Sequence, residues 1–319
     1  MTNGKKQIDK KLHNIHMIGG EKGGVGKTFV SRSLCQYLKS RGTQFALVEA
    51  DAQINDVGRI YASEAAETAT ITLSDDETMQ TEPDVIFNLA VKHPVLVNLP
   101  SNTLDVLEAW IDRVSLLKFM ETEYEGNRLV KWFVSDGCYE SVRQLERSVN
   151  QLDNAIPHVV VLNRGRLNGR DFSYLDDSEI YQRVKEAPNF VTEIEFPSME
   201  SNIQYFIDSN ELTLSEAMQL IQAEMGVLSK QRVKTFIDKL SEGFETAFSA
   251  LKDRGLIAEQ QVPSLADPPS ENEGNEEEGN EENDKEDPER GNTPDTDPTS
   301  FEVSGQHMSP GKPETEPVS

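Results

Sequence analysis

The feature that most constrains this chain is the segment Gly19–Thr28, which reads GGEKGGVGKT. The apolar residues Ile15, Met17 and Ile18 precede it, and a helical repeat of apolar residues begins close after Lys27. A strand, a glycine-rich loop and a helix in this order are typical of a phosphate-binding site. Glycines let successive backbone N–H groups point at one anion, and the helix N-terminus adds its positive dipole end. The segment therefore predicts a nucleotide-binding α/β protein.

Each part of this loop has an expected partner on a bound nucleotide. Lys27 is expected to reach the β- and γ-phosphates, and the Thr28 hydroxyl is expected to ligate Mg²⁺. The residues predicted to contact the nucleotide are Gly23, Gly24, Val25, Gly26, Lys27, Thr28 and Phe29. The competing interpretation is a glycine-rich turn with two surface lysines. It is disfavoured because glycine, lysine and hydroxyl all fall at the required offsets after a predicted strand.

The loop departs from the strict phosphate-binding pattern, which has a glycine where this chain has Glu21. The sequence KGGVGKT with its second lysine, Lys22, resembles the deviant Walker A loop of the ParA/MinD family. This resemblance implies an ATPase that binds ATP and Mg²⁺ and forms an ATP-dependent homodimer. In that family the early lysine reaches across the dimer interface to the partner's ATP. The resemblance therefore implies a catalytic role for Lys22 beside that of Lys27.

Acidic residues follow the second predicted strand, Gln44–Val48. The C-terminal ends of strands are where an α/β sheet places its ligand chemistry. The ParA/MinD family carries a D-x-D-x-Q segment here, and this chain is similar, with Glu49, Asp51 and Gln53 at the same spacing. The resemblance places Asp51 beside Mg²⁺ and the attacking water, as a catalytic and metal-binding residue. The alternative is an acidic turn without a ligand.

The run His93–Pro100 predicts a buried strand that ends in a polar residue and a proline. It resembles the Walker B strand of the family, an apolar run followed by D-x-P, but Asn98 stands where the aspartate is expected. Asn98 is still a candidate metal-site residue, since its carbonyl oxygen accepts hydrogen bonds although it carries no charge. We expect nucleotide binding to survive and hydrolysis to be slow, unless Asp51 or Glu49 supplies the missing charge.

Two residues are candidates for contact with the base. The β-branched run Pro157–Leu162 predicts a central parallel strand, and Asn163 follows it. In the family an asparagine at this place reads the adenine edge through its amide, which offers both a donor and an acceptor; the alternative is an ordinary turn asparagine. Pro197 follows the last predicted strand, Phe190–Phe196, and resembles the family's proline beside the base.

Predicted strands alternate with helices along the chain, which indicates a mostly parallel sheet with helices on both faces. The fold class expected is thus a three-layer α/β P-loop NTPase. Apolar spacing predicts helices over residues 28–41, 54–61, 83–91, 103–125, around 142–152, 215–224 and 229–251. The apolar stripe of 103–125 is either core or a dimer face. The helix 229–251 is expected to dock on the sheet rather than on a partner helix or a membrane.

Two smaller features have local interpretations. Cys35 falls inside the first predicted helix and is expected to be buried packing. Asp136 follows the predicted strand Leu129–Val134, where it either touches the phosphate region or, as we favour, caps the next helix.

The negative charge of the chain is concentrated near its C-terminal end. Residues 261–319 contain 17 acidic and 3 basic residues, a net charge of −14 out of −25 for all 319 residues. This segment has almost no large apolar side chains, so it is predicted to be disordered. We therefore expect a basic lead-in at 1–13, a nucleotide-binding domain at 14–255 and a disordered acidic tail at 256–319. The tail would either repel DNA and other anions or bind a basic partner.

Composition also restricts the partners and the compartment. Tight DNA binding by the chain alone is disfavoured, because such binding depends on Lys and Arg neutralising phosphates. Lys5, Lys6, Lys10 and Lys11 form one local basic patch, interpreted as a solvated lead-in rather than a DNA arm. Two cysteines give no disulfide framework, and no apolar run is long enough to span a bilayer, so a cytoplasmic protein is expected.

Three functional hypotheses follow. Gly19–Thr28, Trp132–Ser141 and His158–Arg164 resemble the MobD- and StbB-like ATPases encoded with plasmid mobilisation, conjugation and stability genes. The first hypothesis is an ATP-dependent dimer switch with weak ATPase activity, acting through a DNA-processing or DNA-binding partner protein. The second is a nucleotide-binding scaffold that hydrolyses little because of Asn98. The third, remote, is a dethiobiotin-synthetase-like ligase or an iron–sulfur reductase on the same fold.

Overall fold

The computed structural model describes residues 12–50, 55–124, 129–167 and 171–257. All of these belong to one compact unit of the chain. Asp51, Gln53 and the predicted tail beyond 257 lie outside the described residues, as does most of the basic lead-in.

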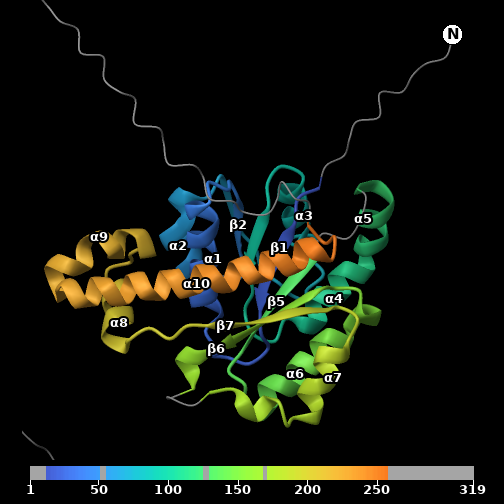
Figure 1. The fold of residues 1–319 in the computed structure, drawn as a ribbon. Helices are drawn as coiled ribbons and strands as arrows, with labels where there is room; N and C mark the ends of the chain where they lie inside the picture. Colours follow the sequence, from blue (N-terminus) through green and yellow to red (C-terminus); the bar gives the residue numbers. More distant parts are fainter. Residues whose placement is uncertain (1–11, 51–54, 125–128, 168–170, 258–319) are drawn as a thin grey trace, which may run out of the picture. The chain divides into compact units, whose positions relative to one another are not determined.

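Seven strands form a single parallel sheet in the order β3-β2-β4-β1-β5-β6-β7 (Figure 1). The strands are β1 (Ile15–Gly19), β2 (Ala46–Glu49), β3 (Glu67–Thr70), β4 (Val95–Asn98), β5 (Leu129–Ser135), β6 (His158–Asn163) and β7 (Phe190–Phe196). Every neighbouring pair is parallel, so the carboxyl ends of all strands lie at one edge. The predicted α/β sheet is confirmed.

Helices cover both faces of the sheet. They are α1 (Lys27–Ser40), α2 (Asp56–Tyr61), α3 (Asp84–Ala90), α4 (Leu104–Arg113), α5 (Leu116–Tyr124), α6 (Tyr139–Asn150), α7 (Glu179–Glu186), α8 (Ser201–Ser209), α9 (Leu214–Met225) and α10 (Val227–Asp253). Short 3₁₀ helices are η1 (Ala62–Glu64), η2 (Gln151–Asn154), η3 (Arg164–Arg166) and η4 (Ser173–Leu175). No helix among the described residues is long and apolar enough to cross a bilayer.

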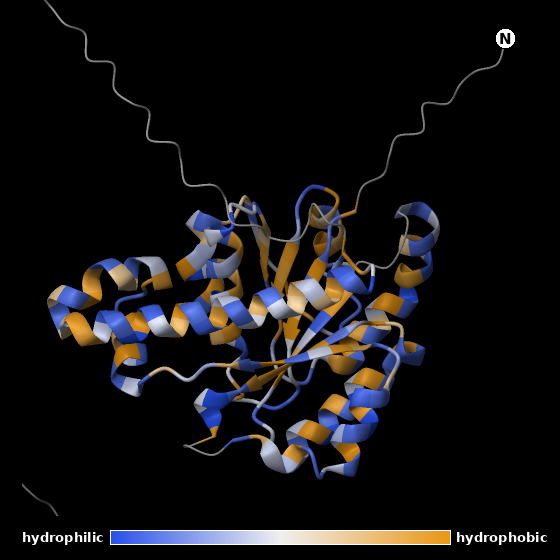
Figure 2. Ribbon diagram, in the orientation of Figure 1, coloured by the Kyte–Doolittle hydropathy of each residue, from blue (hydrophilic) through white to orange (hydrophobic). Residues whose placement is uncertain are grey.

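Alternation along the strands separates the core into two faces. On β1, Ile15 and Met17 pack with α3, α4 and α5, whereas Ile18 packs with α1, α2 and the helices α8 to α10. A third cluster, built on Phe133 and Val160, lies under α6 and α7. Figure 2 shows the central strands mostly in the hydrophobic colour, and helices with one hydrophobic and one hydrophilic side. The three-layer arrangement follows from this alternation.

The long α10 docks on the sheet, as expected. Its buried side chains include Phe236, Phe244 and Phe248, and the ring of Phe248 contacts those of Trp132 and Tyr37. The core continues past the helix to Ile257, which is 3% exposed. The folded body therefore reaches at least this residue, two positions beyond the predicted boundary at 255.

The prediction of one helix over residues 103–125 is wrong. The segment forms α4 and α5, which are separated by Val114 and Ser115, and Ser115 has a left-handed φ of 50°. The buried residues Leu107, Trp110, Ile111, Leu116 and Met120 nevertheless pack in the core, which is the first of the two alternatives left open for the apolar stripe.

Candidate functional site

The glycine-rich loop lies between β1 and α1, at the carboxyl edge of the sheet. Gly24 and Gly26 have positive φ values of 75° and 102°, a conformation that residues with a Cβ rarely adopt. A Cβ at Gly26 would also lie 2.3 Å from Nδ2 of Asn163. The loop therefore has the conformation that the predicted order of strand, glycine-rich loop and helix requires.

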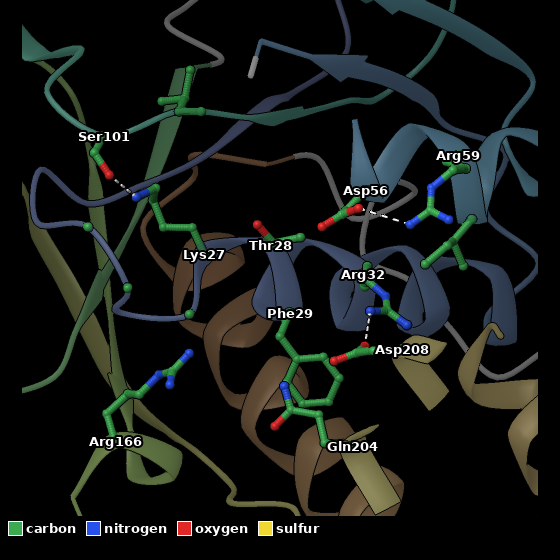
Figure 3. A pocket seen from close by; sticks show the side chains of 15 residues that line it. Lys27, Thr28, Phe29, Arg32, Asp56, Arg59, Ser101, Arg166, Gln204 and Asp208 are labelled. Atoms are coloured by element: carbon green, nitrogen blue, oxygen red, sulfur yellow. Dashed lines mark hydrogen bonds and ion pairs between the residues drawn. The ribbon is translucent and has the colours of Figure 1, made fainter. Parts of the chain in front are cut away.

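An open cavity of about 490 Å³ adjoins the loop (Figure 3). Of the predicted nucleotide contacts it is lined by Gly23, Gly24, Gly26, Lys27, Thr28 and Phe29. Val25 does not line it, since its side chain is buried beneath the loop at 1% exposure. Further lining residues that the sequence did not single out are Arg32, Asp56, Arg59, Ser101, Arg166, Gln204 and Asp208. The cavity has the position expected for a phosphate-bearing ligand.

Lys27 is held at the mouth of this cavity. Its Nζ donates a hydrogen bond to Oγ of Ser101 at 2.6 Å and lies 3.5 Å from the carbonyl oxygen of Lys22 (Figure 3). Ser101 follows β4 by three residues, so the strand that resembles Walker B positions the phosphate-loop lysine through a hydroxyl. Sequence reasoning missed Ser101 because nothing in its local pattern marks it.

Lys22 turns toward β5. Its Nζ donates to Oδ2 of Asp136 at 2.5 Å and lies 3.2 Å from Sγ of Cys138. These hydrogen bonds, that of Asp136 first, raise the pKa of Lys22. Burial opposes ionisation of Asp136, but the hydrogen bonds from Lys22 and Cys138 outweigh it and lower the pKa of Asp136. In this arrangement Lys22 is engaged within its own subunit.

The preferred role for Asp136, helix capping, is wrong. The N-cap residue of α6 is Cys138, whose backbone N–H donates to Oδ1 of Asp136. Asp136 thus closes a turn before the helix with one oxygen and binds Lys22 with the other. The alternative, contact with the phosphate region, describes its place better, since Lys22 belongs to the phosphate loop.

Asn98 lies in a buried chain of hydrogen bonds between two strands and a helix. Ser31 on α1 donates to Oδ1 of Asn98 at 2.8 Å, and Nδ2 of Asn98 donates to Oε1 of Glu49 at 2.7 Å. All three residues are at most 2% exposed. The carboxylate that accompanies the Walker B-like position is therefore that of Glu49, at the end of β2.

Glu21, the residue that replaces the expected glycine, has a structural role. Its Oε2 accepts the backbone N–H of Leu104, the first residue of α4, and its Oε1 lies 3.6 Å from Nζ of Lys131. Burial lowers the pKa of Lys131, and the Glu21 charge opposes this shift. The pair ties the loop to β5 and to the N-terminus of α4, where a carboxylate is favoured by the helix dipole.

Asn163 faces the loop rather than the cavity. Its Nδ2 donates to the carbonyl of Val25 at 2.7 Å, and its Oδ1 accepts the N–H of Gly165 at 2.9 Å. Pro197 lines a second cavity, of about 710 Å³, together with Phe236 of α10. Neither Asn163 nor Pro197 lines the cavity at Lys27, and contact of both with adenine stays a prediction.

The far wall of the first cavity is formed by charged residues that pair with one another. Arg32 is 5% exposed and donates to Asp208 at 2.6 Å and to the carbonyl of Leu212 at 3.0 Å. Arg59 donates to Asp56 at 3.0 Å (Figure 3). Arg32 and Asp208 are 176 positions apart, so no local pattern reveals their pairing. Asp56 and Arg59 lie three residues apart on α2, outside the motifs singled out in the sequence.

The model of the family described as the CobQ/CobB/MinD/ParA nucleotide binding domain matches residues 16–260. The chain belongs to this family. Membership confirms the predicted ParA/MinD-type family.

Individual proteins similar to this chain share less than 30% of its residues. Protein MobD of Acidithiobacillus ferrooxidans is 27% identical over 216 residues, which cover 65% of this chain and 87% of MobD. The cell division ATPase MinD of Pyrococcus furiosus shares 19% identity over 74% of this chain and 99% of that chain, with a TM-score of 0.45. MinD of Pyrococcus horikoshii, solved with Mg-ADP, shares 18% identity over 78% of this chain and all of that chain, again with a TM-score of 0.45.

Proposed function

We propose that this protein is an ATP·Mg²⁺-dependent dimer switch with weak ATPase activity that acts in plasmid mobilisation, conjugative transfer or partition. The observation that carries the proposal is the phosphate loop, which holds Lys27 and Thr28 at the wall of an open cavity. Family membership over residues 16–260 and the similarity to MobD support it.

The chain supplies groups for each part of the ligand. Backbone N–H groups of the loop and Lys27 would bind the phosphates, and Thr28 would hold Mg²⁺ together with carboxylates at the strand ends. Glycines with left-handed φ and a hydroxyl lining the cavity fit such a ligand. Bound Mg²⁺ would neutralise charge that develops on the phosphates during transfer.

The switch requires Lys22 to exchange partners. In the monomer it binds Asp136, and in the dimer it would bind the phosphates held by the other subunit. A nucleotide shifts such an equilibrium only by its differential affinity for the two states. ATP meets this condition because its γ-phosphate would lie closest to the second subunit's lysine, whereas ADP lacks this group.

The decisive experiment measures molecular mass in solution without nucleotide, with ADP and with ATP·Mg²⁺. The wild type is expected to be monomeric in the first two conditions and dimeric in the third. Lys22→Ala is expected to bind ATP but stay monomeric, and Lys27→Ala is expected to lose nucleotide affinity. Dimerisation that is independent of ATP, or no nucleotide binding in calorimetry, would contradict the proposal.

A second candidate is a nucleotide-binding scaffold with little hydrolysis. The observation that favours it is the neutral side chain of Asn98 at the Walker B-like position, engaged by Ser31 and Glu49. Such a protein would bind ATP and dimerise without measurable phosphate release. A time course of phosphate release at saturating Mg²⁺ distinguishes it from the switch.

The remote iron–sulfur alternative finds no support at the cysteines. Cys35 is wholly buried within α1, and burial together with the charge of Glu49 raises the pKa of its thiol. A cluster shared between subunits needs cysteines that reach a common surface, and Cys35 does not. Among the described residues no group of three or more His, Cys, Asp or Glu side chains is arranged to hold a metal.

A further inference from the structure

The turn that follows β6 brings an arginine to the side of the phosphate loop opposite to Ser101. Arg166, the last residue of η3, lines the cavity that is also lined by Lys27 and Thr28. Its Nε is 3.9 Å from the position that a Cβ on Gly26 would occupy. Figure 3 shows Ser101 and Arg166 on opposite sides of the loop, with the Arg166 guanidinium directed toward it. A second cationic side chain therefore adjoins the loop.

The donors of Arg166 are available to a ligand. The side chain is exposed, and no described residue forms a hydrogen bond or an ion pair with it. Arg164, at the other end of the same turn, instead pairs with Glu195 and lines the second cavity. A guanidinium offers five donors in a planar fork that fits phosphate oxygens. Such a group, beside backbone amides that suit a phosphate, indicates an anion as the partner of Arg166.

The amide of Asn163 fixes this turn and the phosphate loop at the same time. Its Oδ1 accepts the N–H of Gly165 within the turn, and its Nδ2 donates to the carbonyl of Val25 in the loop. Asn163 is 4% exposed, so both bonds are made in the interior. Leu167, the residue after Arg166, is buried in the core. The backbone that carries Arg166 is therefore anchored on both sides.

We infer that Arg166 binds a phosphate of the nucleotide and that Asn163 is the positioning residue that holds Arg166 beside the loop. This inference rests on the proposed nucleotide-binding function. The phosphate is one that ADP and ATP share, because Arg166 lies across the loop from the contact of Lys27 with Ser101. Arg166 contributes to nucleotide affinity in the monomer, whereas Lys22 acts between subunits.

The test is the affinity of the full chain for ADP, measured by calorimetry with excess Mg²⁺. ADP is the probe because the proposed dimer forms only with ATP, so ADP binding is not coupled to association. Arg166→Gln removes the charge and the fork of donors. It is expected to weaken ADP binding about tenfold, the scale of a hydrogen bond between charged groups.

Arg164→Gln is the matched control for this change. It removes the same charge two residues away, from an arginine that pairs with Glu195 and does not line the first cavity. The affinity for ADP should stay as in the wild type. Thermal unfolding without nucleotide should give the same midpoint for the wild type and both variants, which shows that all three are folded.

Salt separates a contact with phosphate from a loss of structure. The range of attraction between exposed charges shortens from about 10 Å at 0.1 M ionic strength to about 3 Å at 1 M. Over this range the wild type and Arg164→Gln should lose more ADP affinity than Arg166→Gln loses. Arg166→Lys keeps the charge without the planar fork, so it should recover part of the affinity. Equal salt dependence in the wild type and Arg166→Gln would contradict a contact with phosphate.

The positioning role of Asn163 is tested through its coupling to Arg166. Asn163→Ala removes both hydrogen bonds and is expected to weaken the binding of ADP and GDP by the same factor. This factor should be smaller in the Arg166→Gln background, because the two residues then act on one contact. Fully additive effects, or a loss confined to ADP, would overturn the positioning role; the second result would assign Asn163 to the adenine.

The outcomes distinguish this inference from the proposed function. If the wild type does not bind ADP, the proposed function fails. If the wild type binds ADP and Arg166→Gln binds it equally well, only the role of Arg166 is overturned. A loss of affinity in Arg166→Gln that Arg164→Gln does not share supports the inference.

Discussion

The Lys22–Asp136 ion pair competes with the use that we propose for Lys22. The pair is partly exposed, with Lys22 at 38% and Asp136 at 15%, so its contribution is at most about 1 kcal/mol. Asp136→Asn weakens the hold on Lys22 without altering side-chain shape. We predict that the ATP concentration giving half-maximal dimer falls by about two- to fivefold, as this energy allows. Sizing at graded ATP concentrations measures it.

Asp105→Asn is the matched control for that change. Asp105 on α4 forms an exposed ion pair with Arg147 on α6 that does not involve Lys22. Asp105→Asn should leave the ATP concentration that gives half-maximal dimer unchanged. A half-maximal ATP concentration that stays the same or rises in Asp136→Asn would show that the ion pair does not restrain Lys22.

Two buried histidines predict how stability depends on pH. Burial lowers the pKa of His16 to about 4 and that of His158 to about 3. Both are neutral when folded, and the unfolded chain takes up their protons as the pH falls through 6.5. Folding stability is therefore lost from about pH 6.5 down to about pH 4, at about 1.4 kcal/mol per pH unit and histidine.

This loss should be visible as a decrease of roughly 4 kcal/mol in the free energy of unfolding between pH 7 and pH 5. Asp136, whose pKa is lowered, stabilises the fold above its ordinary pKa and loses this effect only at lower pH. Urea unfolding at several pH values measures the slope. Equal stability at pH 7 and pH 5 would be incompatible with neutral, buried His16 and His158.

At the scale of elements, the break between α4 and α5 depends on one backbone conformation. Ser115 is exposed and has a φ of 50°, which is costly for side chains branched at Cβ. We predict that Ser115→Val lowers the free energy of unfolding by about 1–2 kcal/mol, whereas Ser115→Gly leaves it unchanged or raises it slightly. Urea unfolding of the two variants beside the wild type decides this. Equal effects of valine and glycine would argue for a continuous helix.

Elements with a strong apolar pattern were predictable, and those without one were not. The parallel strands β1, β4, β5 and β6 are near-continuous apolar runs, as burial on both faces requires. By contrast β3, with the sequence ETAT, is a half-exposed edge strand, and its polar composition gives no such signal. The short helices α7 and α8 were missed because few of their residues are buried.

The candidate site also has a part that could be predicted from the sequence and a part that could not. The phosphate loop was predictable because its residues are contiguous and because the left-handed φ values of Gly24 and Gly26 favour glycine. The bonds of Lys22 to Asp136, of Lys27 to Ser101 and of Asn98 to Glu49 join residues separated by 49 to 114 positions. Such pairings arise only when the sheet brings strand ends to one edge, so no local pattern reports them.

At the scale of the whole molecule, net charge determines how strongly the protein can bind DNA without sequence specificity. The chain carries −25, of which residues 262–319 contribute 17 acidic and 3 basic residues, and the remainder is still net negative. Affinity for a random duplex grows with the number of phosphates neutralised by Lys and Arg and falls steeply with salt. A net-negative body gives little of this affinity even without the acidic segment.

We therefore predict that the full chain and a chain ending at residue 261 both bind a random duplex weakly, with or without ATP. Their Kd at 0.15 M salt should not lie below about 1 µM, because non-specific Kd values at physiological salt are typically near 10⁻⁴–10⁻⁶ M. Fluorescence anisotropy with a labelled duplex measures this, and ATP-dependent dimerisation of both chains shows that they are functional. Tight binding by the shortened chain alone would mean that the acidic segment screens a DNA-binding surface. Weak binding by both is the result expected if the plasmid role that we propose depends on a DNA-binding partner protein.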